Sequence, residues 1–515
     1  MVPGSSTSNG PIADTASGRI RGSLRNGVAV FRGIPFSQAP VGDLRFRPPQ
    51  PALPWPGVRD CTQAGPIAPQ NVWDLEKLLG AGDMPQDEDC LTLNVWTPST
   101  EGRRPVMVWI HGGAFATGTG RTPWYEGSRL ASMRDVVVVT FNYRLGILGF
   151  CYLAEMAGER FASSGMNGIL DQIAALEWVR DNISALGGDP TEVTIFGESA
   201  GAMSVGTLLG TPAASGLFRR AILQSGACSN TSPPDKATRI TMEVLETLGL
   251  STGESAKLAD LPVDALLAAQ QTVADMRGAY LSFQPVVDGV HLPRSPLESL
   301  SLQSAAGVDI IVGTNEEEMK LFGIDDPSLR DVDEPQMIAQ MTSLGGHLFD
   351  EERARGLISA YRHQFPDLDL GALWFQMLTD YVFRMPATKV AEEQSAFANV
   401  YYYLFSWASP AFGGMIGSSH SLEIPFVFDN LDRQGVDMFT GGPDAPGRQP
   451  LATTMSSAWT AFAHGRSPAG PGMPDWPPYD LDTRSTMIFD LQCRVEKDHE
   501  PEIRELWEGV DFRFT

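Results

Sequence analysis

The chain has few positive charges and no long apolar run. Its 515 residues include 38 Lys and Arg against 62 Asp and Glu, so the formal net charge is −24 at pH 7. A field of this sign repels nucleic acid and anionic membrane surfaces, and we expect neither as a partner. No window approaches the roughly 18 consecutive apolar residues that predict a membrane span. With 43% hydrophobic residues, the composition is that of an ordinary globular protein.

The N-terminus lacks the pattern of a signal peptide. Residues 1–18 are rich in Ser, Gly, Thr and Pro, and no basic start precedes an apolar segment. We interpret residues 1–17 as a flexible arm. The chain is then either cytoplasmic or a secreted protein whose leader has been removed, and the sequence favours neither location.

Cysteine and histidine are scarce. The five cysteines are an odd number, so at least one thiol is expected to be free if the others pair within the chain. None is spaced as a metal site. Seven histidines leave few candidates for a general base.

Apolar runs of strand length alternate with helical stretches along most of the chain, which predicts an α/β fold with a mostly parallel sheet flanked by helices. We find no internal repeat and no linker, and therefore expect a single domain over residues 1–515. Leu- and Ala-rich helical stretches around 253–306 and 325–399 are interpreted as insertions that roof the site. Asn26-Gly27 predicts a hairpin between 18–22 and 28–34. The other expected strands are 88–96, 105–110, 136–141, 193–197, 220–226, 308–314 and 400–405, with a late edge strand at 485–490.

The strand at 193–197 ends in Gly197-Glu198-Ser199-Ala200-Gly201, the G-x-S-x-G pattern of a nucleophile elbow. A strand enters a turn too tight for side chains on either side of the serine, and a helix follows at once. By itself the pattern also fits an ordinary strand-to-helix turn. A nucleophilic serine needs a base, an acid that orients the base, and donors for the oxyanion.

His420 is the best candidate for the base. It lies in a Gly/Ser loop after the strand at 400–405, at the same end of a parallel sheet as Ser199. Glu316, Glu317 and Glu318 follow the strand at 308–314, and any of them would satisfy the order serine, acid, histidine of α/β-hydrolases. Three adjacent carboxylates could equally form a solvated surface run.

Several further motifs make the chain resemble the type B carboxylesterase family of cholinesterases and carboxylesterases, in the style of bacterial para-nitrobenzyl esterases. The resemblance covers nearly the whole length. Its motifs are Phe31-Arg-Gly-Ile-Pro-Phe, Glu88-Asp-Cys-Leu-Thr-Leu-Asn-Val, Trp109-Ile-His-Gly-Gly-Ala-Phe, Asn142-Tyr-Arg, Asn167-Gly-Ile-Leu-Asp-Gln, Gly187-Gly-Asp-Pro, Phe196-Gly-Glu-Ser-Ala-Gly, Gln224-Ser-Gly, Pro285-Val-Val-Asp-Gly, Gly313-Thr-Asn-x-x-Glu and His420-x-x-Glu-Ile-Pro-Phe-Val-Phe.

The resemblance implies an α/β-hydrolase fold and hydrolysis of small carboxylic esters through an acyl-enzyme. Ser199 would be the nucleophile, His420 the base and Glu318 the acid, because the family's glutamate stands five residues after the strand's glycine. No metal or organic cofactor is implied. A carbamate, amide or polyester bond is an alternative target of the same triad. A non-catalytic, cholinesterase-like binding protein is a remote alternative, since such proteins typically lose a triad residue and carry a membrane span.

The resemblance also assigns the oxyanion donors to the backbone of Gly113, Ala114 and Ala200, and supporting positions to Glu198 and Ser225. Two positions depart from the family pattern. Ala114 stands where a third glycine is common, and Met319 stands where glycine usually follows the acid.

A disulfide between Cys61 and Cys90, closing a loop at the rim of the site, is implied by the resemblance as well. The alternative is two reduced thiols, as in a cytosolic protein. The loop closed by this disulfide would include Trp73. Aromatic residues proposed as pocket walls are Trp124, Phe283, Phe322, Trp374 and Phe412. The oligomeric state stays open, with a monomer favoured.

Overall fold

A large twisted sheet forms the centre of the protein. The computed structural model describes residues 10–73, 77, 84–278, 281–344, 350–510 and 512. Within them the sheet has eleven strands in the order β14-β13-β12-β11-β10-β9-β7-β8-β6-β4-β3. The strands from β13 to β8 run parallel, and β14, β6, β4 and β3 join by antiparallel pairing. In chain order the strands are β3 (Ser23–Arg25), β4 (Val28–Pro35), β6 (Thr92–Thr97), β7 (Arg104–Ile110), β8 (Val137–Phe141), β9 (Gly188–Glu198), β10 (Arg220–Gln224), β11 (Asp309–Asn315), β12 (Val400–Phe405), β13 (Ser485–Phe489) and β14 (Arg494–Lys497).

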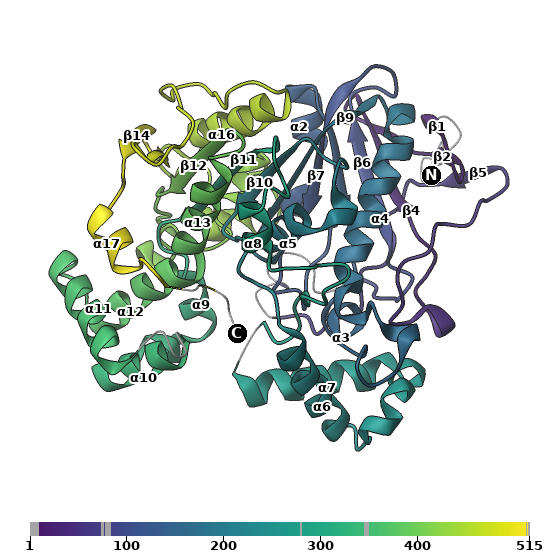
Figure 1. Cartoon of the computed structure of the whole chain (residues 1–515). Coiled ribbons are helices and arrows are strands. Elements are labelled where there is room, and N and C mark those ends of the chain that lie inside the picture. Colours follow the sequence, from purple (N-terminus) through teal and green to yellow (C-terminus); the bar gives the residue numbers. More distant parts are fainter. Residues whose placement is uncertain are drawn as a thin grey trace, which may run out of the picture.

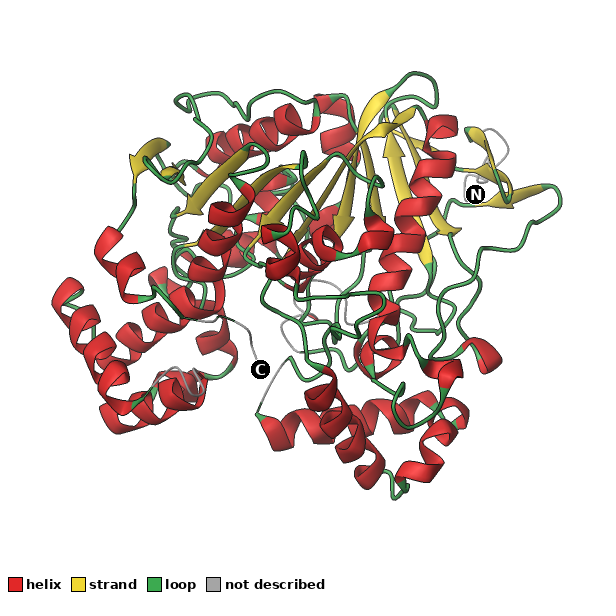
Figure 2. Ribbon diagram, viewed as in Figure 1, coloured by secondary structure: helices red, strands yellow, loops and turns green. Residues whose placement is uncertain are grey.

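Helices cover both faces of this sheet, as Figure 2 shows. On β7, Val106 and Val108 pack into one apolar cluster, while Met107 and Trp109 pack into another. This alternation follows from the two-residue period of a strand, and both faces are apolar because both are covered. The first cluster includes α4 (Asn167–Asn182), α5 (Ala200–Gly210) and α13 (Met385–Gln394); the second includes α2 (Ser128–Arg134) and α16 (Arg448–Ala463).

The N-terminal segment differs from the expectation in two ways. Ile12–Thr15 forms β1, which pairs with β2 (Gly18–Arg21), so this part of the expected arm is a strand. β2 also pairs with β5 (Val58–Asp60) in a separate three-stranded sheet. The turn at Asn26-Gly27 is present, with φ of 50° and 82°, but the strand before it is Ser23–Arg25 rather than residues 18–22.

The helical insertions lie along one side of the sheet (Figure 1). The first contains a 3₁₀ segment at Thr252–Asp260, α7 (Val263–Arg277) and α8 (Pro296–Ser301), preceded by α6 (Pro234–Thr247). The second contains α10 (Glu334–Leu344), α11 (Glu351–Gln364), α12 (Leu370–Thr379) and a π-helical turn at Asp380–Arg384, and it has an apolar cluster of its own. The remaining short helices are α3 (Gly146–Phe150), α9 (Lys320–Asp325), α14 (Ile424–Val427), α15 (Val436–Thr440) and α17 (Pro501–Leu506).

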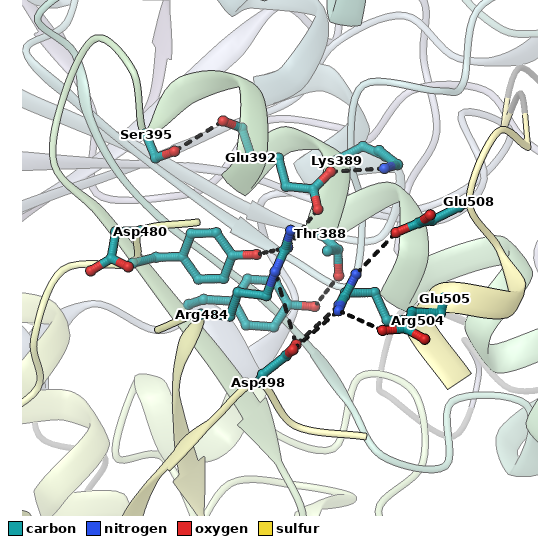
Figure 3. Close-up of polar contacts among 12 residues, drawn as sticks. Thr388, Lys389, Glu392, Ser395, Asp480, Arg484, Asp498, Arg504, Glu505 and Glu508 are labelled. Atoms are coloured by element: carbon teal, nitrogen blue, oxygen red, sulfur yellow. Dashed lines mark hydrogen bonds and ion pairs between the residues drawn. The ribbon is translucent and has the colours of Figure 1, made fainter. Parts of the chain in front are cut away.

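The C-terminal segment is fixed by an arginine–carboxylate network (Figure 3). Arg484 donates to Glu392 at 2.6 Å and to the Tyr479 hydroxyl at 2.8 Å. Arg504 donates to both carboxylate oxygens of Asp498, at 3.0 and 3.1 Å. The strand expected at 485–490 is β13, but it does not form the sheet edge, because β14 pairs along its outer side and is itself the edge.

No helix within the described ranges combines the length and apolar content that crossing a bilayer requires.

Candidate active site

Ser199 stands at the turn between β9 and α5, as the elbow pattern predicts. Its φ of 55° and ψ of −128° lie in a region that L-residues rarely adopt. A Cβ on Gly201 would lie 2.0 Å from the carbonyl oxygen of Ile110, and one on Gly197 would lie 2.6 Å from the carbonyl carbon of Gly201. Glycine is therefore required on both sides of the serine, which is half-buried at the end of the strand.

His420 and Glu318 are brought together from separate strands. Glu318 follows β11, His420 follows β12, and these strands are parallel neighbours. The Nδ1 atom of His420 lies 2.7 Å from Oε2 of Glu318, and both side chains are buried. The amide of Asn315 donates to the other carboxylate oxygen of Glu318 at 2.8 Å, which holds that carboxylate in place.

The two neighbouring glutamates do not reach the imidazole. Glu317 pairs with Lys320 at 2.6 Å and accepts from the amide of Ser418 at 2.9 Å. Burial raises the pKa of Glu316, although the charge of Arg384 acts in the opposite direction. Of the three candidate acids, the geometry thus brings Glu318 to His420.

Glu198 lies on the opposite side of the imidazole. Its Oε1 atom is 3.1 Å from Nε2 of His420 and accepts from the Ser421 hydroxyl at 2.5 Å. Burial raises the pKa of Glu198 to about 8. Burial lowers the pKa of His420, but Glu198 and Glu318 together outweigh it and raise the pKa to about 9. Because Glu198 and His420 are in contact, the protonation of one affects the protonation of the other.

His111, which begins the glycine loop, has a different environment. Its ring is buried, stacks on Tyr143 at 4.5 Å between centroids, and has Nδ1 2.9 Å from the carbonyl oxygen of Gly112. Burial lowers its pKa to about 4. This imidazole is part of the support beneath the loop.

The glycine loop packs directly against the elbow. A Cβ on Gly112 would lie 2.9 Å from Oε2 of Glu198 and 3.0 Å from Cβ of Ser199. Gly113 and Ala114 both have positive φ, 106° and 52°, and in the described part of the chain their amides have no backbone acceptor. Ala114 therefore adopts the left-handed conformation that glycine usually supplies, at a cost of about 1–2 kcal/mol.

These groups share one cavity of about 350 Å³. Gly113, Ala114, Ser199 and His420 line it together with Glu198. Residues from both helical insertions complete the walls: Leu281, Leu329, Val382 and Phe383. A larger cavity of about 880 Å³ lies at the starts of β9, β10 and β11, at the other end of these strands, and includes none of these site residues.

A half-buried serine with a buried histidine and glutamate, beside a loop whose amides at Gly113 and Ala114 have no backbone acceptor among the described residues, is the arrangement of an acyl-transfer enzyme. The sequence profile of the carboxylesterase family matches residues 9–507. The chain belongs to the carboxylesterase family.

Known relatives agree with this assignment over nearly their whole length. A para-nitrobenzyl esterase of Bacillus subtilis (strain 168) is 39% identical, over 96% of this chain and 98% of its own. A phenmedipham hydrolase of Pseudarthrobacter oxydans is 36% identical, over 95% and 97%. The crystal structure of a Geobacillus stearothermophilus carboxylesterase at pH 6.2 has a TM-score of 0.87 at 40% identity and covers 96% of this chain and all of that one. The expected α/β-hydrolase fold is thereby confirmed.

The sequence analysis did not select Glu423, a third carboxylate near His420. Glu423 is fully buried and accepts from Asn315 at 2.7 Å and from Gln224 at 3.0 Å. Burial and the nearby Glu318 raise its pKa. The signal was present, because Glu423, Asn315 and Gln224 all stand in motifs that carry the family resemblance. Their contacts become apparent only when β10, β11 and the start of α14 are brought together in the fold.

The supporting positions are only partly explained by the geometry. Glu198 contacts His420 directly, as described. Ser225 is buried after β10 with φ of 51°, and its amide donates to the carbonyl oxygen of Gly313 at 2.9 Å. Its hydroxyl has no hydrogen-bond partner among the described residues. Met319 has an ordinary φ of −70° and lines the cavity, so no glycine is needed there.

Few of the proposed aromatic walls reach the cavity. Of the five, Phe322 lines it, and its ring lies 5.3 Å from that of His420; Trp73, expected in the loop at the rim, lines the cavity as well. Phe383, which was not proposed, lies closer, at 4.8 Å. The others lie elsewhere: Trp124 in the cluster with α16, Trp374 in the cluster of the second insertion, Phe283 beside a neighbouring cavity, and Phe412 exposed at the surface.

Cys61 and Cys90 are buried free thiols, so the disulfide implied by the resemblance is absent from the structure. Burial raises the pKa of Cys61 to about 12, and it raises the pKa of Cys90 as well. Both pack in the apolar cluster on one face of the sheet, where they act as small hydrophobic side chains.

Across the described ranges, no cluster of three or more His, Cys, Asp or Glu residues is arranged to hold a metal ion.

Proposed function

We propose that this chain hydrolyses small carboxylic esters through an acyl-enzyme on Ser199, with the whole chain acting as one catalytic unit. The observation that carries the proposal is the position of His420. One ring nitrogen is held by Glu318 at 2.7 Å, while the ring faces the cavity that contains Ser199. This is the placement a general base needs beside a serine nucleophile.

The first half of the reaction forms the acyl-enzyme. The Ser199 hydroxyl oxygen attacks the ester carbonyl carbon, and its proton passes to Nε2 of His420. The carbonyl oxygen becomes an oxyanion that the amides of Gly113, Ala114 and Ala200 hold; each such donor is typically worth roughly 100- to 1,000-fold in rate. The intermediate collapses when His420 gives its proton to the leaving alkoxide oxygen, and the alcohol departs.

The second half returns the free enzyme. Water attacks the acyl carbon while His420 takes its proton, and collapse of the second intermediate returns that proton to Ser199 and releases the carboxylate. In both halves a positive imidazolium forms between Glu318 on Nδ1 and Glu198 on Nε2. These carboxylates lie 2.7 and 3.1 Å from the two ring nitrogens and stabilise the positive charge in a site of low dielectric.

The test is kcat/KM for para-nitrophenyl esters of increasing acyl length, measured on wild-type protein and on Ser199→Ala. We expect Ser199→Ala to lose roughly 10⁴-fold or more. Ser301→Ala, at an exposed position of α8, serves as the matched serine control and should retain activity. Wild-type turnover no faster than Ser199→Ala would contradict the proposal and favour a binding protein of this fold.

A further inference from the structure

A second, cationic cavity lies beside the catalytic one. It has a volume of about 280 Å³, and three arginines line it: Arg32 from β4, Arg121 and Arg433. We call it the arginine pocket. Thr122 lines both this pocket and the catalytic cavity, so one residue forms a shared wall between them.

The charges in the arginine pocket are unbalanced. Among its described lining residues, Glu126 carries the only negative charge. Glu126 accepts from Arg433 at 2.9 Å and lies 4.0 Å from Arg32. Arg121 donates at 2.7 Å to the carbonyl oxygen of Gly65, a neutral acceptor. Three guanidinium groups therefore face one carboxylate, in a chain whose net charge is −24.

Burial makes this imbalance costly. Burial and the nearby Arg25 lower the pKa of Arg32, and burial lowers the pKa of Arg121. Both shifts have the direction expected for cations that are partly removed from water without a full counter-charge. A bound anion would supply that counter-charge and relieve the repulsion.

Two residues that line the arginine pocket have hydrogen-bond donors without an acceptor. Arg433 Nε and Trp96 Nε1 are buried and have no acceptor among the described residues. Trp96 is 4% exposed, and the guanidinium of Arg32 lies 6.0 Å from its ring centroid. Buried N–H groups are nearly always paired, so a missing partner at a cationic cavity indicates acceptor atoms of a ligand.

We propose that the arginine pocket binds a small oxyanion, a carboxylate or a phosphate. The planar fork of a guanidinium matches the two oxygens of either group. The carboxylate released by ester hydrolysis is formed on the other side of Thr122 and is the natural occupant. That choice of occupant rests on the function proposed above, whereas the anion site itself does not.

The experiment measures binding of sodium benzoate and of sodium phosphate to Ser199→Ala protein by titration calorimetry, with sodium chloride at equal ionic strength as the blank. We expect saturable binding that Arg121→Gln weakens at least about tenfold, because a charged hydrogen bond is lost. Arg103→Gln, an exposed arginine paired with Asp189 outside the pocket, is the matched control and should bind unchanged.

The outcomes separate the sources and test the site. Binding of both anions identifies a general oxyanion site, and binding of benzoate alone identifies a carboxylate site. If Arg121→Gln does not fold, as judged by its circular dichroism, Arg433→Gln replaces it. Absence of saturable binding, or binding that the arginine substitutions leave unchanged, overturns the proposal. Because the Ser199→Ala protein needs no turnover, either negative result leaves the proposed ester hydrolysis intact.

Discussion

Two groups of charged residues in this protein, one buried and one partly exposed, differ in their balance of charge. The first, which we call the histidine cluster, consists of His420 with Glu198, Glu318 and Glu423. The second is the arginine–carboxylate network of the C-terminal segment in Figure 3, built on Arg484 and Arg504.

In the histidine cluster, carboxylates outnumber cations. In the described part of the chain, His420 is the only ion-pair partner of Glu198 and Glu318. The pKa values of Glu198 and His420 are raised to about 8 and about 9, so both groups change protonation near neutral pH. Groups that titrate in this range can move protons during a reaction.

In the C-terminal network, the opposite charges are matched. Glu392 binds Lys389 at 2.8 Å and Arg484 at 2.6 Å, and these contacts outweigh burial and lower its pKa. The same network outweighs burial and raises the pKa of Arg484. Both groups therefore stay ionised at all ordinary pH values and serve to hold the segment in place. In this protein, the group of charges that lacks enough counter-charges is the one proposed to carry out the reaction. The arginine pocket is a second group of charges without enough counter-charges.

The largest effect should come from neutralising the acid of the histidine cluster. Glu318→Gln keeps the shape but removes the charge that orients and stabilises the imidazolium, so we expect kcat/KM to fall roughly 10³- to 10⁴-fold. The measurement is kcat/KM on a para-nitrophenyl ester. Glu317→Gln, one residue away and paired with Lys320, is the control. A greater loss in that control would show that the wrong glutamate has been assigned.

An intermediate effect, on stability alone, is expected from the C-terminal network. Arg484→Leu removes the partner of Glu392 and Tyr479, and we expect the free energy of unfolding to fall by about 2–3 kcal/mol, as for a largely buried charged hydrogen bond. Urea denaturation measures this change. kcat/KM at 25 °C should stay within about threefold of the wild type. A large loss of activity in the folded variant would break the contrast between the two groups.

The smallest effect is a shift in pH dependence. His420 acts as a base only when neutral, so kcat/KM falls as the pH drops through its pKa. Glu198 raises that pKa, and Glu198→Gln should therefore move the acid limb of the pH profile to lower pH. The measurement is kcat/KM between about pH 5 and 10.5, a range that includes the raised pKa of about 9 and the ordinary imidazole pKa of about 6.5. Glu101→Gln, exposed and distant in sequence, controls for overall charge. An unchanged limb would show that Glu198 does not act on the base.

Local physics made much of the fold predictable. The strands at 105–110, 136–141 and 400–405 are continuous apolar runs because the sheet is covered on both faces, and the structure has strands at all three. The elbow was predictable for a steric reason, since a Cβ at either glycine would collide with backbone. The C-terminal edge was mistaken because β14, a short polar strand, has no periodicity that a sequence reveals.

The sequence predicted the candidate site only where the residues of one motif, or the order of the strands, determine where the side chains lie. Ser199 and its glycines lie within five residues, and the order of Ser199, Glu318 and His420 follows from the parallel strands that carry them. The contacts of Glu423 with Gln224 and Asn315 depend on two strands, β10 and β11, meeting the start of α14. The aromatic walls failed for the same reason, because Trp374 and Phe412 look alike in sequence yet one is buried and the other exposed.

The sequence by itself determined the alternation of strands and helices, the elbow and the family, because each depends on neighbouring residues or on motifs that stand in order along the chain. Only the tertiary structure decided that Glu198 lies beside Nε2 of His420, the ring nitrogen that Glu318 does not contact. It also decided that Cys61 and Cys90 stay unpaired. The same holds for the three arginines that line one pocket with a single carboxylate. These features depend on distances between segments remote in sequence. Such distances set burial and charge balance, and through them the pKa values on which the chemistry depends.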